Sequence, residues 1–270
     1  MKVEIGISKS LQESADAYYA LAKKAKKKLE GLEKASLEMD KKIFSAMGPG
    51  VPQKKLHRKR EREWFEKFRW FYTSEGFLVL GGKDAKTNET IVKKIMQPQD
   101  IYFHADIHGA PHVVLKTGGK NPSEASKKEA AVFAASFSSA WREHLPYIDV
   151  YSAKPEQLSK KAPSGESIGT GAFMVYGKRE WFRKTPLDFA LGFRETPEKG
   201  IELFPGPESA VRKNSSFYVN ILFGGEPKSA AAKKTLKIFA GKLSGAYPQL
   251  LDDIAALLPS GNLRVENPRN

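Results

Sequence analysis

The chain has 270 residues, 40% of them hydrophobic and none of them cysteine, so it can bury a sizeable core but excludes disulfides, thiolate nucleophiles and cysteine-ligated metals. Its formal net charge of +14 favours a polyanionic partner such as nucleic acid, and residues 1–70 hold 18 Lys and Arg against 10 Asp and Glu. It has neither an apolar run long enough to span a membrane nor the apolar core of a secretory signal, so we expect a cytoplasmic chain without membrane contact.

Residues 8–46 are predicted to form one long helix. Apolar and small residues recur there at alternating steps of four and three over roughly five heptads, the pattern of a coiled-coil seam. The breaker MGPGVP at 47–52 and a second, shorter helical stretch at 53–72 then predict an antiparallel helical hairpin. An amphipathic helix lying on the globular body is the alternative. The seam positions are Leu11, Ala15, Tyr18, Ala22, Ala25, Leu29, Leu32, Ser36, Met39 and Ile43.

From residue 77 the hydrophobic pattern changes to short strands separated by turns, one of which is GKDAKTNE at 82–89. A long amphipathic helix with Asn121 or Ser123 as its N-cap interrupts these strands. One central helix within a β-rich run predicts an α+β domain. The expected strands are 76–82, 90–96, 101–107, 112–118, 148–153 and 172–182, and the expected helix is 121–144.

Residues 198–270 are predicted to form a small α/β C-terminal extension. Its expected elements are a strand at 217–224, helices at 229–243 and 248–258, and a last strand at 262–267. The fold class is therefore α+β, with a long N-terminal antiparallel coiled-coil hairpin, a mixed β-rich α+β domain and this extension. The corresponding domains are 1–72, 73–197 and 198–270.

Three histidines recur every fourth residue in IYFHADIHGAPH at 101–112, namely His104, His108 and His112. On a strand, His104 and Asp106 share one face because side chains alternate. A metal site is one interpretation, since imidazole and carboxylate groups are zinc ligands. Polar packing of a tight turn is the other, and we favour it because zinc ligands are more often spaced along a helix or across loops. Whether His104 and His108 contact a ligand or only hold the turn is left open.

Two further segments carry candidate chemistry. In GGEPKSAAAKK, two glycines precede a helix start at Lys228 and Ser229 whose amides could hold an anion, although an ordinary capped helix start is the simpler interpretation. The run HRKREREWFEKFRWFY at 57–72 interleaves basic and aromatic residues, which suits phosphate contacts and base stacking, yet most of its aromatics are expected in a core. Ser164 lacks the partners of a nucleophile elbow.

Four motifs, in order along the chain, resemble the C-terminal RNA-binding (NFACT-R) domain of the NFACT family of ribosome-associated quality-control factors. They are REWFEKFRWFYTSEGFLVLGGKDAKTNE, QDIYFHADIHGAPHVVLK, SKKAPSGESIGTGAFMVYGKREWF and ALGF. The first 45 residues resemble the start of the family's coiled coil, and the segment after residue 197 resembles an extension of archaeal members. The resemblance covers residues 2–195 and does not include the family's N-terminal tRNA-recruiting domain. A natural short protein and a part of a longer one are both left open.

The resemblance implies a non-enzymatic RNA-binding module, with no cofactor and no metal, that binds tRNA and the rRNA of the large ribosomal subunit in the rescue of stalled nascent chains. A protein partner, such as one resembling a ubiquitin ligase, is expected at the coiled coil, and a homodimer is left open. Two alternatives stay. One is a metal- or phosphate-dependent hydrolase that uses His104, Asp106 and His108, and the other is a coiled-coil adaptor between proteins.

RNA contacts are implied for basic residues at the base of the hairpin and in the loops, and for polar residues of the histidine turn. Lys83 stands where many family members carry Arg, which weakens a bidentate phosphate contact there. His112 lies outside the family motif and is interpreted as incidental. The expected RNA-binding residues are Arg58, Lys59, Arg60, Arg62, Lys67, Arg69, Lys83, His104, Asp106, His108, Lys160, Lys161, Lys178 and Arg179.

Overall fold

The computed structural model describes residues 63–161, 168–196, 200–244 and 250–268, together with nine positions between residues 12 and 31. The chain forms two compact units, residues 1–54 and residues 55–270. The seam of the expected coiled-coil hairpin lies outside the described residues, because none of its ten positions is among them. The nine described positions of the first unit are each helical and exposed: Gln12, Asp16, Tyr19, Ala20, Leu21, Lys23, Lys24, Lys28 and Gly31.

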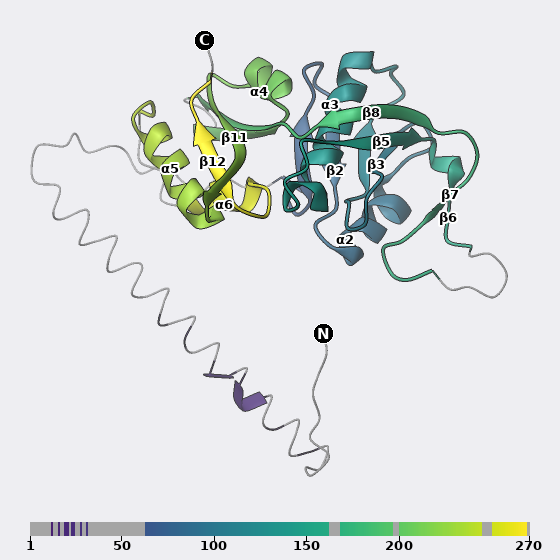
Figure 1. The fold of residues 1–270 in the computed structure, drawn as a ribbon, viewed down its shortest axis with the longest axis horizontal. Helices are drawn as coiled ribbons and strands as arrows, with labels where there is room; N and C mark the ends of the chain where they lie inside the picture. The colour runs from purple at the N-terminus through teal and green to yellow at the C-terminus, as the bar shows by residue number, and fades with distance from the viewer. Residues whose placement is uncertain are drawn as a thin grey trace, which may run out of the picture. The chain divides into compact units, whose positions relative to one another are not determined.

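The second unit contains a six-stranded sheet in the order β1-β2-β4-β3-β5-β8 (Figure 1). All neighbouring strands in it run antiparallel. Helix α3 covers one face, and the helical segment α2–η1 packs against the other. The elements are β1 (Arg69–Tyr72), β2 (Leu78–Gly81), α2 (Ala85–Thr90), η1 (Ile91–Ile95), β3 (Ile101–Ala105), β4 (Val113–Lys116), α3 (Glu124–Ser136), β5 (Tyr147–Ala153) and β8 (Glu180–Pro186).

Neighbouring residues on β3 enter opposite cores, because side chains alternate across a strand. Phe103 packs with Phe133 in the core beneath α3, whereas Tyr102 packs with Ile91 in the core on the other face. Helix α3 begins at Ser123, whose side chain accepts a hydrogen bond from the Ser126 amide, so one of the two expected N-caps is confirmed. The expected α+β architecture is confirmed by this sheet and its helices.

The prediction of a turn at 82–89 followed by a strand at 90–96 is wrong. Residues 85–95 are helical, as α2 and the π-helical turn η1, and residues 82–84 precede the helix. Asp84 starts the helix with a capping box, in which its side chain accepts from the Thr87 amide and the Thr87 side chain accepts from the Asp84 amide. Ile91 and Ile95, one helical turn apart, then pack against the same core, so tertiary contact overrides the strand propensity of these β-branched residues.

Three further boundaries differ from the sequence-based prediction. The helix was expected to continue to residue 72, but its last four residues form strand β1, whose Trp70 and Phe71 enter opposite cores. The strand expected at 172–182 is broken at Gly177 (φ 77°) into β7 and β8. The helix expected to reach residue 144 ends at Ser136. The short elements here are the 3-10 turns η2 (Ser139–Trp141) and η3 (Pro155–Gln157) and the two-stranded sheet of β6 (Leu158–Ser159) and β7 (Met174–Val175).

A four-stranded antiparallel sheet in the order β10-β9-β11-β12 forms the C-terminal part of the unit. Helices α5 and α6 cover the face that carries Phe189, Leu191 and Phe193. Among the described residues, no helix is long and apolar enough to cross a membrane. The elements are β9 (Phe189–Thr196), β10 (Gly200–Gly206), α4 (Glu208–Asn214), β11 (Phe217–Glu226), α5 (Lys228–Ala240), α6 (Leu250–Leu257) and β12 (Leu263–Glu266).

The two sheets pack together within one unit. Phe137 lies against both the core beneath α3 and the core beneath α5 and α6. The Asn214 side chain donates hydrogen bonds to the carbonyls of Tyr72 (3.0 Å) and Thr73 (3.2 Å). Strand pairing also crosses both expected domain boundaries, since β1 pairs with β2 across residue 72 and β9 with β10 across residue 197.

Candidate nucleic-acid interface

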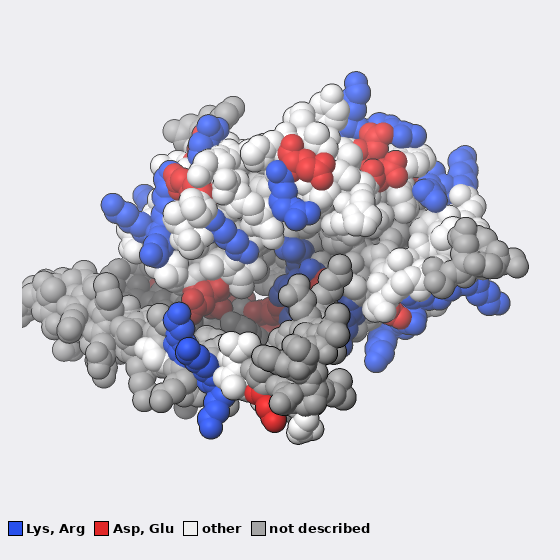
Figure 2. Space-filling view, turned by 60° about the horizontal axis from the view of Figure 1, so that its bottom comes forward, with Lys and Arg blue, Asp and Glu red and all other residues white. Residues whose placement is uncertain are grey.

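A cleft of about 420 Å³ opens where the start of α2, the β3–β4 turn and the loop before β7 meet. It is the size of a small-ligand site. Figure 2 shows the molecule with the lower side of Figure 1 turned forward, where Lys and Arg side chains lie around a hollow together with several Asp and Glu side chains. The lining comes from Arg69, residues 82–85, Asn88, His104, residues 107–112, Phe137 and residues 170–172.

Asn88 fastens the β3–β4 turn to the start of α2. Its side-chain oxygen accepts a hydrogen bond from the His112 amide at 3.0 Å, and the Gly82 amide donates to the His112 carbonyl at 3.1 Å. A Cβ on Gly82 would lie 1.8 Å from the Asn88 side-chain oxygen, so only glycine fits there. These contacts set the width of the cleft between residues 82 and 112.

Glu89 fastens the opposite wall. Its carboxylate accepts from the Gly171 amide at 3.0 Å and pairs with Lys93 at 2.5 Å and Lys160 at 3.6 Å. The hydrogen bond from Lys93, followed by that from Gly171, lowers the pKa of Glu89 to about 2. Gly171 has φ +80° and its Cβ would lie 2.6 Å from the Ala85 carbonyl oxygen, which requires glycine at this position.

His104 and His112 stack on each other in the wall of the cleft, His112 buried and His104 partly buried. The His112 Nδ1 lies 2.5 Å from the Tyr102 hydroxyl, and the His104 and His112 rings stack with centroids 4.9 Å apart. The His104 Nδ1 lies 3.0 Å from the Pro111 carbonyl oxygen, so it donates to that acceptor. Burial, and next the neighbouring His104, lower the pKa of His112 to about 3, and burial also lowers the pKa of His104. Both rings are therefore neutral near pH 7.

The interpretation of His112 as incidental is wrong, because it is buried and bonded at both its ring and its backbone. His104 faces inward beside it, whereas Asp106 and His108 are exposed. Within the described part of the chain, no three His, Cys, Asp or Glu residues lie close enough to hold a metal ion. The hydrolase alternative therefore gains no support from these residues.

Arg69 is partly buried at the cleft. Its Nε donates to the Gly82 carbonyl at 3.3 Å, and its guanidinium carbon lies 4.3 Å from the centre of the Phe137 ring. Burial lowers the pKa of Arg69 to about 10. Lys83, across the cleft mouth, is exposed and donates to the Glu66 carbonyl at 3.3 Å.

The remaining expected residues are distributed around the domain. Lys160 lies at the Glu89 wall with its ammonium 4.7 Å from the Phe173 ring centre. Arg179 donates to the Val175 carbonyl and stacks on Tyr151. Lys67, Lys161 and Lys178 are exposed outside the cleft, and Arg58, Lys59, Arg60 and Arg62 lie outside the described residues.

Sequence reasoning did not single out Asn88, Gly171 or Phe137 as parts of the same site. They come from three distant segments, and only the sheet order brings them together. Of these three residues, only Asn88 could have been assigned to the site from the sequence, because an Asn at the end of a predicted turn can form a hydrogen bond with a neighbouring backbone.

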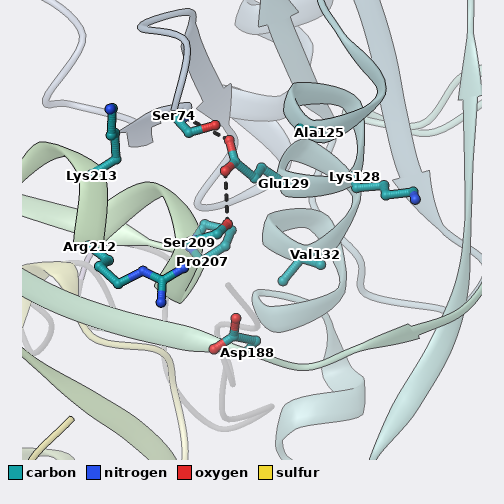
Figure 3. Close-up of a pocket in the computed structure, with 10 residues that line it drawn as sticks. All are labelled: Ser74, Ala125, Lys128, Glu129, Val132, Asp188, Pro207, Ser209, Arg212 and Lys213. Carbon is teal, nitrogen blue, oxygen red and sulfur yellow. Dashed lines mark hydrogen bonds between the residues drawn. The ribbon is translucent and has the colours of Figure 1, made fainter. Parts of the chain in front are cut away.

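A second pocket of about 530 Å³ lies between α3 and α4 (Figure 3). Glu129 is buried there and accepts hydrogen bonds from the Ser74 amide and the Ser209 hydroxyl, each at 2.8 Å. Because the protein itself satisfies both oxygens of this carboxylate, Glu129 fastens α4 to α3. No expected RNA-binding residue lines this pocket, and its exposed Arg212 and Lys213 serve below as control positions.

The residues that line the cleft fall within a segment of the chain that matches a known family. Residues 67–177 match the family model described as NFACT protein RNA binding domain. The archaeal Rqc2 homolog aRqcH of Methanocaldococcus jannaschii is 38% identical over 233 residues, which cover 86% of this chain and 31% of that protein. Ribosome quality control complex subunit NEMF of Homo sapiens is 37% identical over 174 residues, 64% of this chain and 16% of that protein.

The Drosophila melanogaster NEMF homolog is 36% identical over 195 residues, 70% of this chain and 20% of that protein. The chain therefore spans about a third or less of the length of these relatives. Most of the six-stranded sheet, helix α3 and the cleft fall within the matched range, so this part is an NFACT-type RNA-binding domain. By these matches the chain belongs to the NFACT family of ribosome quality-control proteins, with an archaeal homologue among its similar relatives.

Proposed function

We propose that this chain binds RNA at the cleft and takes part in ribosome quality control, with tRNA and the rRNA of the large ribosomal subunit as its RNA partners. The observation that carries the proposal is the position of Arg69 and Lys83 at a cleft inside the range matched to an RNA binding domain. Arg and Lys supply the phosphate contacts that dominate the affinity of such proteins for RNA.

A binding role without catalysis fits the chemistry of this cleft best. General acid–base catalysis needs a group that changes its protonation near the working pH. Burial lowers the pKa of both His104 and His112, so both rings are neutral near pH 7, and the pKa of Glu89 is held at about 2. These groups support the architecture of the walls, which leaves the cations and backbone groups to contact a ligand.

The proposal extends to the partners expected for such a factor. A coiled coil N-terminal to β1 would reach a protein partner or a second copy of the chain, and the ribosome-bound function would place the chain in the cytoplasm. The division at residues 72 and 197 stays part of the same proposal as a division of functional regions, since strand pairing joins these regions within one compact unit. Co-sedimentation of the purified chain with large ribosomal subunits, compared with small subunits, tests the choice of partner.

The salt dependence of RNA binding tests the proposal at the cleft. We expect the affinity of the chain for tRNA to fall steeply with salt, with each phosphate contact contributing about 0.7 to the slope of log affinity against log salt for single-stranded contacts. Lys83→Gln should weaken binding several-fold and reduce that slope. Arg69→Lys keeps the charge but loses the planar guanidinium, and should also weaken binding.

The matched control is the double variant Arg212→Gln/Lys213→Gln at the second pocket, which removes two positive charges away from the cleft. It should change RNA affinity less than Lys83→Gln alone. Affinity that is flat between low and moderate salt would contradict the proposed function. An equal effect of the control would show that RNA senses net charge and not the cleft.

A further inference from the structure

Tyr176, the residue after β7, presents a large aromatic side chain on the surface of the second unit. Its side chain is 49% exposed and lies outside the residues that line the cleft. Ala172 of the cleft wall is four residues away, so the two Cα atoms are separated by at most about 14 Å. In Figure 1, β6 and β7 lie at the end of the unit away from α5 and α6. A single RNA strand that enters the cleft therefore has Tyr176 within reach.

Gln157, the last residue of η3, holds this tyrosine in place. Its side chain donates to the carbonyls of Tyr176 (2.7 Å) and Lys178 (2.9 Å), and the Tyr176 amide donates to the Gln157 carbonyl at 2.9 Å. The Tyr176 hydroxyl donates to the Lys161 carbonyl at 3.3 Å. Because both its backbone and its hydroxyl are bonded, the side chain is positioned before a ligand arrives, and binding costs little conformational entropy.

The ring of Tyr176 is left uncovered, in contrast to aromatic rings nearby in the sheet. The Arg179 guanidinium carbon lies 4.5 Å from the centre of the Tyr151 ring, and that of Arg183 lies 4.0 Å from the Trp181 ring. Within the described residues, the Tyr176 ring has no such cationic partner and stacks on no other ring. Its exposed surface is therefore available to another flat π system, such as a nucleobase.

Two lysines beside Tyr176 supply positive charge for the backbone of such a ligand. Lys161 accepts from the tyrosine hydroxyl through its carbonyl, Lys178 follows two residues later, and both are exposed. Neither ammonium group is paired with a residue that the structure describes, whereas the carboxylate of Glu156 lies 3.9 Å from the Lys154 ammonium. An exposed aromatic ring beside unpaired cations is how proteins bind single-stranded nucleic acid, since cations contact phosphates and the ring stacks on a base.

We propose that Tyr176 stacks on an unpaired base of the bound RNA, while Lys161 and Lys178 contact adjoining phosphates. This inference rests on the proposed function and deepens it, because it specifies that the RNA segment next to the cleft is single-stranded. The bases of a duplex are already stacked on one another and cannot cover the tyrosine ring. Since every base has a π-face, the Tyr176 site selects unpaired RNA without selecting a sequence.

The test compares Tyr176→Leu with Tyr147→Leu, because Tyr147 is similarly exposed (52%) but lies at the start of β5. Binding of the full chain to a single-stranded oligoribonucleotide and to duplex RNA is measured from low to moderate salt. Tyr176→Leu should weaken single-strand binding about 5-fold or more, the effect of losing one stacked base, whereas Tyr147→Leu changes it less than about 2-fold. The salt slope should stay unchanged in Tyr176→Leu, since no phosphate contact is lost, and neither variant should alter duplex binding.

Further comparisons separate stacking from charge and from folding. Lys178→Gln should lower the salt slope by about 0.7, the value for one phosphate contact, whereas Lys237→Gln at an exposed position of α5 should not. Tyr176→Phe keeps the ring but loses the hydrogen bond to Lys161, and should retain most of the affinity. An abasic oligoribonucleotide of equal length and charge should bind the parent more weakly than the base-bearing strand, and this difference should shrink in Tyr176→Leu. Thermal unfolding verifies that each variant is folded, and the abasic comparison in the parent needs no substitution.

The outcomes distinguish this inference from the proposed function. Equal single-strand affinities of Tyr176→Leu and Tyr147→Leu, or equal losses in Tyr176→Phe and Tyr176→Leu, would overturn the stacking role. Equal binding of abasic and base-bearing RNA by the parent would overturn it as well. In each case, steep salt-dependent binding that Lys83→Gln weakens would leave the proposed function standing. Absence of RNA binding by the parent itself would overturn both.

Discussion

At the residue scale, the cleft depends on a few positions where neighbouring backbones approach closely. Gly82 and Gly171 allow that approach because they have no side chain. The Asn88 side chain then accepts a hydrogen bond from the His112 amide, and the Glu89 carboxylate accepts one from the Gly171 amide. These residues hold the walls and leave Arg69 directed into the space between them. Small changes at the walls should therefore alter both stability and ligand access.

Gly82→Ala tests the closeness of this packing. Its Cβ would meet the Asn88 side-chain oxygen at 1.8 Å and the Asn88 amide nitrogen at 2.9 Å, so the Asn88–His112 hydrogen bond must break. We expect a loss of about 2–4 kcal/mol in the free energy of unfolding, measured by urea denaturation. Gly225→Ala, where a Cβ meets nothing within 4 Å, is the control and should change stability by less than about 1 kcal/mol. Equal effects would contradict the account of Gly82.

The buried His112 should make stability depend on pH. Its pKa is about 3 in the folded chain, whereas an unfolded histidine titrates near pH 6.5. Between these values the unfolded state binds a proton that the folded state does not, so the free energy of unfolding falls as pH drops from about 6.5 toward 3. One such group contributes a slope of up to about 1.4 kcal/mol per pH unit.

His112→Gln should reduce this slope between pH 6.5 and 4.5, as measured by urea unfolding at several pH values. Some slope should persist, since burial also lowers the pKa of His104. Above pH 7.5 the difference between parent and variant should be constant, which serves as the internal control. An unchanged slope in the variant would mean that His112 is not the group that resists protonation.

At the element scale, a buried ion pair holds the turn between η1 and β3 to the end of β4. Asp100 is 2% exposed and accepts from the amides of Gln97 (2.8 Å) and Thr117 (3.1 Å). It also pairs with Lys116, which in turn donates to the Ile95 carbonyl at 2.8 Å. One carboxylate thus joins the end of a helical turn to two strands, and it helps set the register of the sheet behind the cleft.

Asp100→Asn keeps the shape of this side chain and removes its charge. We expect a loss of about 3 kcal/mol in the free energy of unfolding, because the partly buried Lys116 ammonium loses its counter-ion. The matched change at an exposed pair, Glu156→Gln opposite Lys154, should cost less than about 1 kcal/mol. Thermal or urea unfolding measures both, and similar losses in the two variants would show that burial of the pair is unimportant.

At the scale of the whole molecule, the two sheets of residues 55–270 belong to one compact unit. Phe137 contributes to two cores, and Asn214 bonds the β1 end from α4. Gly206 reaches so close to Phe71 that a Cβ there would lie 2.9 Å from its ring. These contacts should couple the unfolding of the C-terminal sheet to that of the sheet that bears the cleft.

Hydrogen exchange tests this coupling. Phe239 is fully buried in the core of the second sheet, where its ring lies 4.8 Å from that of Phe193. Phe239→Ala should lower the free energy of unfolding by about 3–5 kcal/mol and reduce amide protection in β3 as much as in β11. Lys237→Gln on the same helix should leave both unchanged. Loss of protection confined to β11 would show that the two sheets open independently.

Local sequence signals and tertiary contacts determined different parts of the fold. Ser123 before an Ala-rich amphipathic stretch predicted α3, and the runs around Phe103 and Val114 predicted β3 and β4, because caps and short apolar runs act locally. The prediction of a strand for TIVKKIM was wrong. Its β-branched residues favour a strand by propensity, but the capping box at Asp84 and packing against the core around Tyr102 make it helical. The prediction that the basic–aromatic run stays helical to residue 72 was wrong for the same reason, because pairing with β2 makes its last residues strand β1.

By itself, the sequence determined the basic character of the chain, the α+β class and the resemblance that indicated an RNA-binding domain, since charge, periodicity and motif order are properties of neighbouring residues. Only the tertiary structure decided which of the expected cations share a cleft, that His112 is a buried partner of Tyr102, and that Phe137 lies against Arg69. These facts join residues that are distant along the chain, as the Tyr102–His112 bond shows over ten positions. Strand order and the packing of one sheet on the other create such proximity, and no local pattern encodes it.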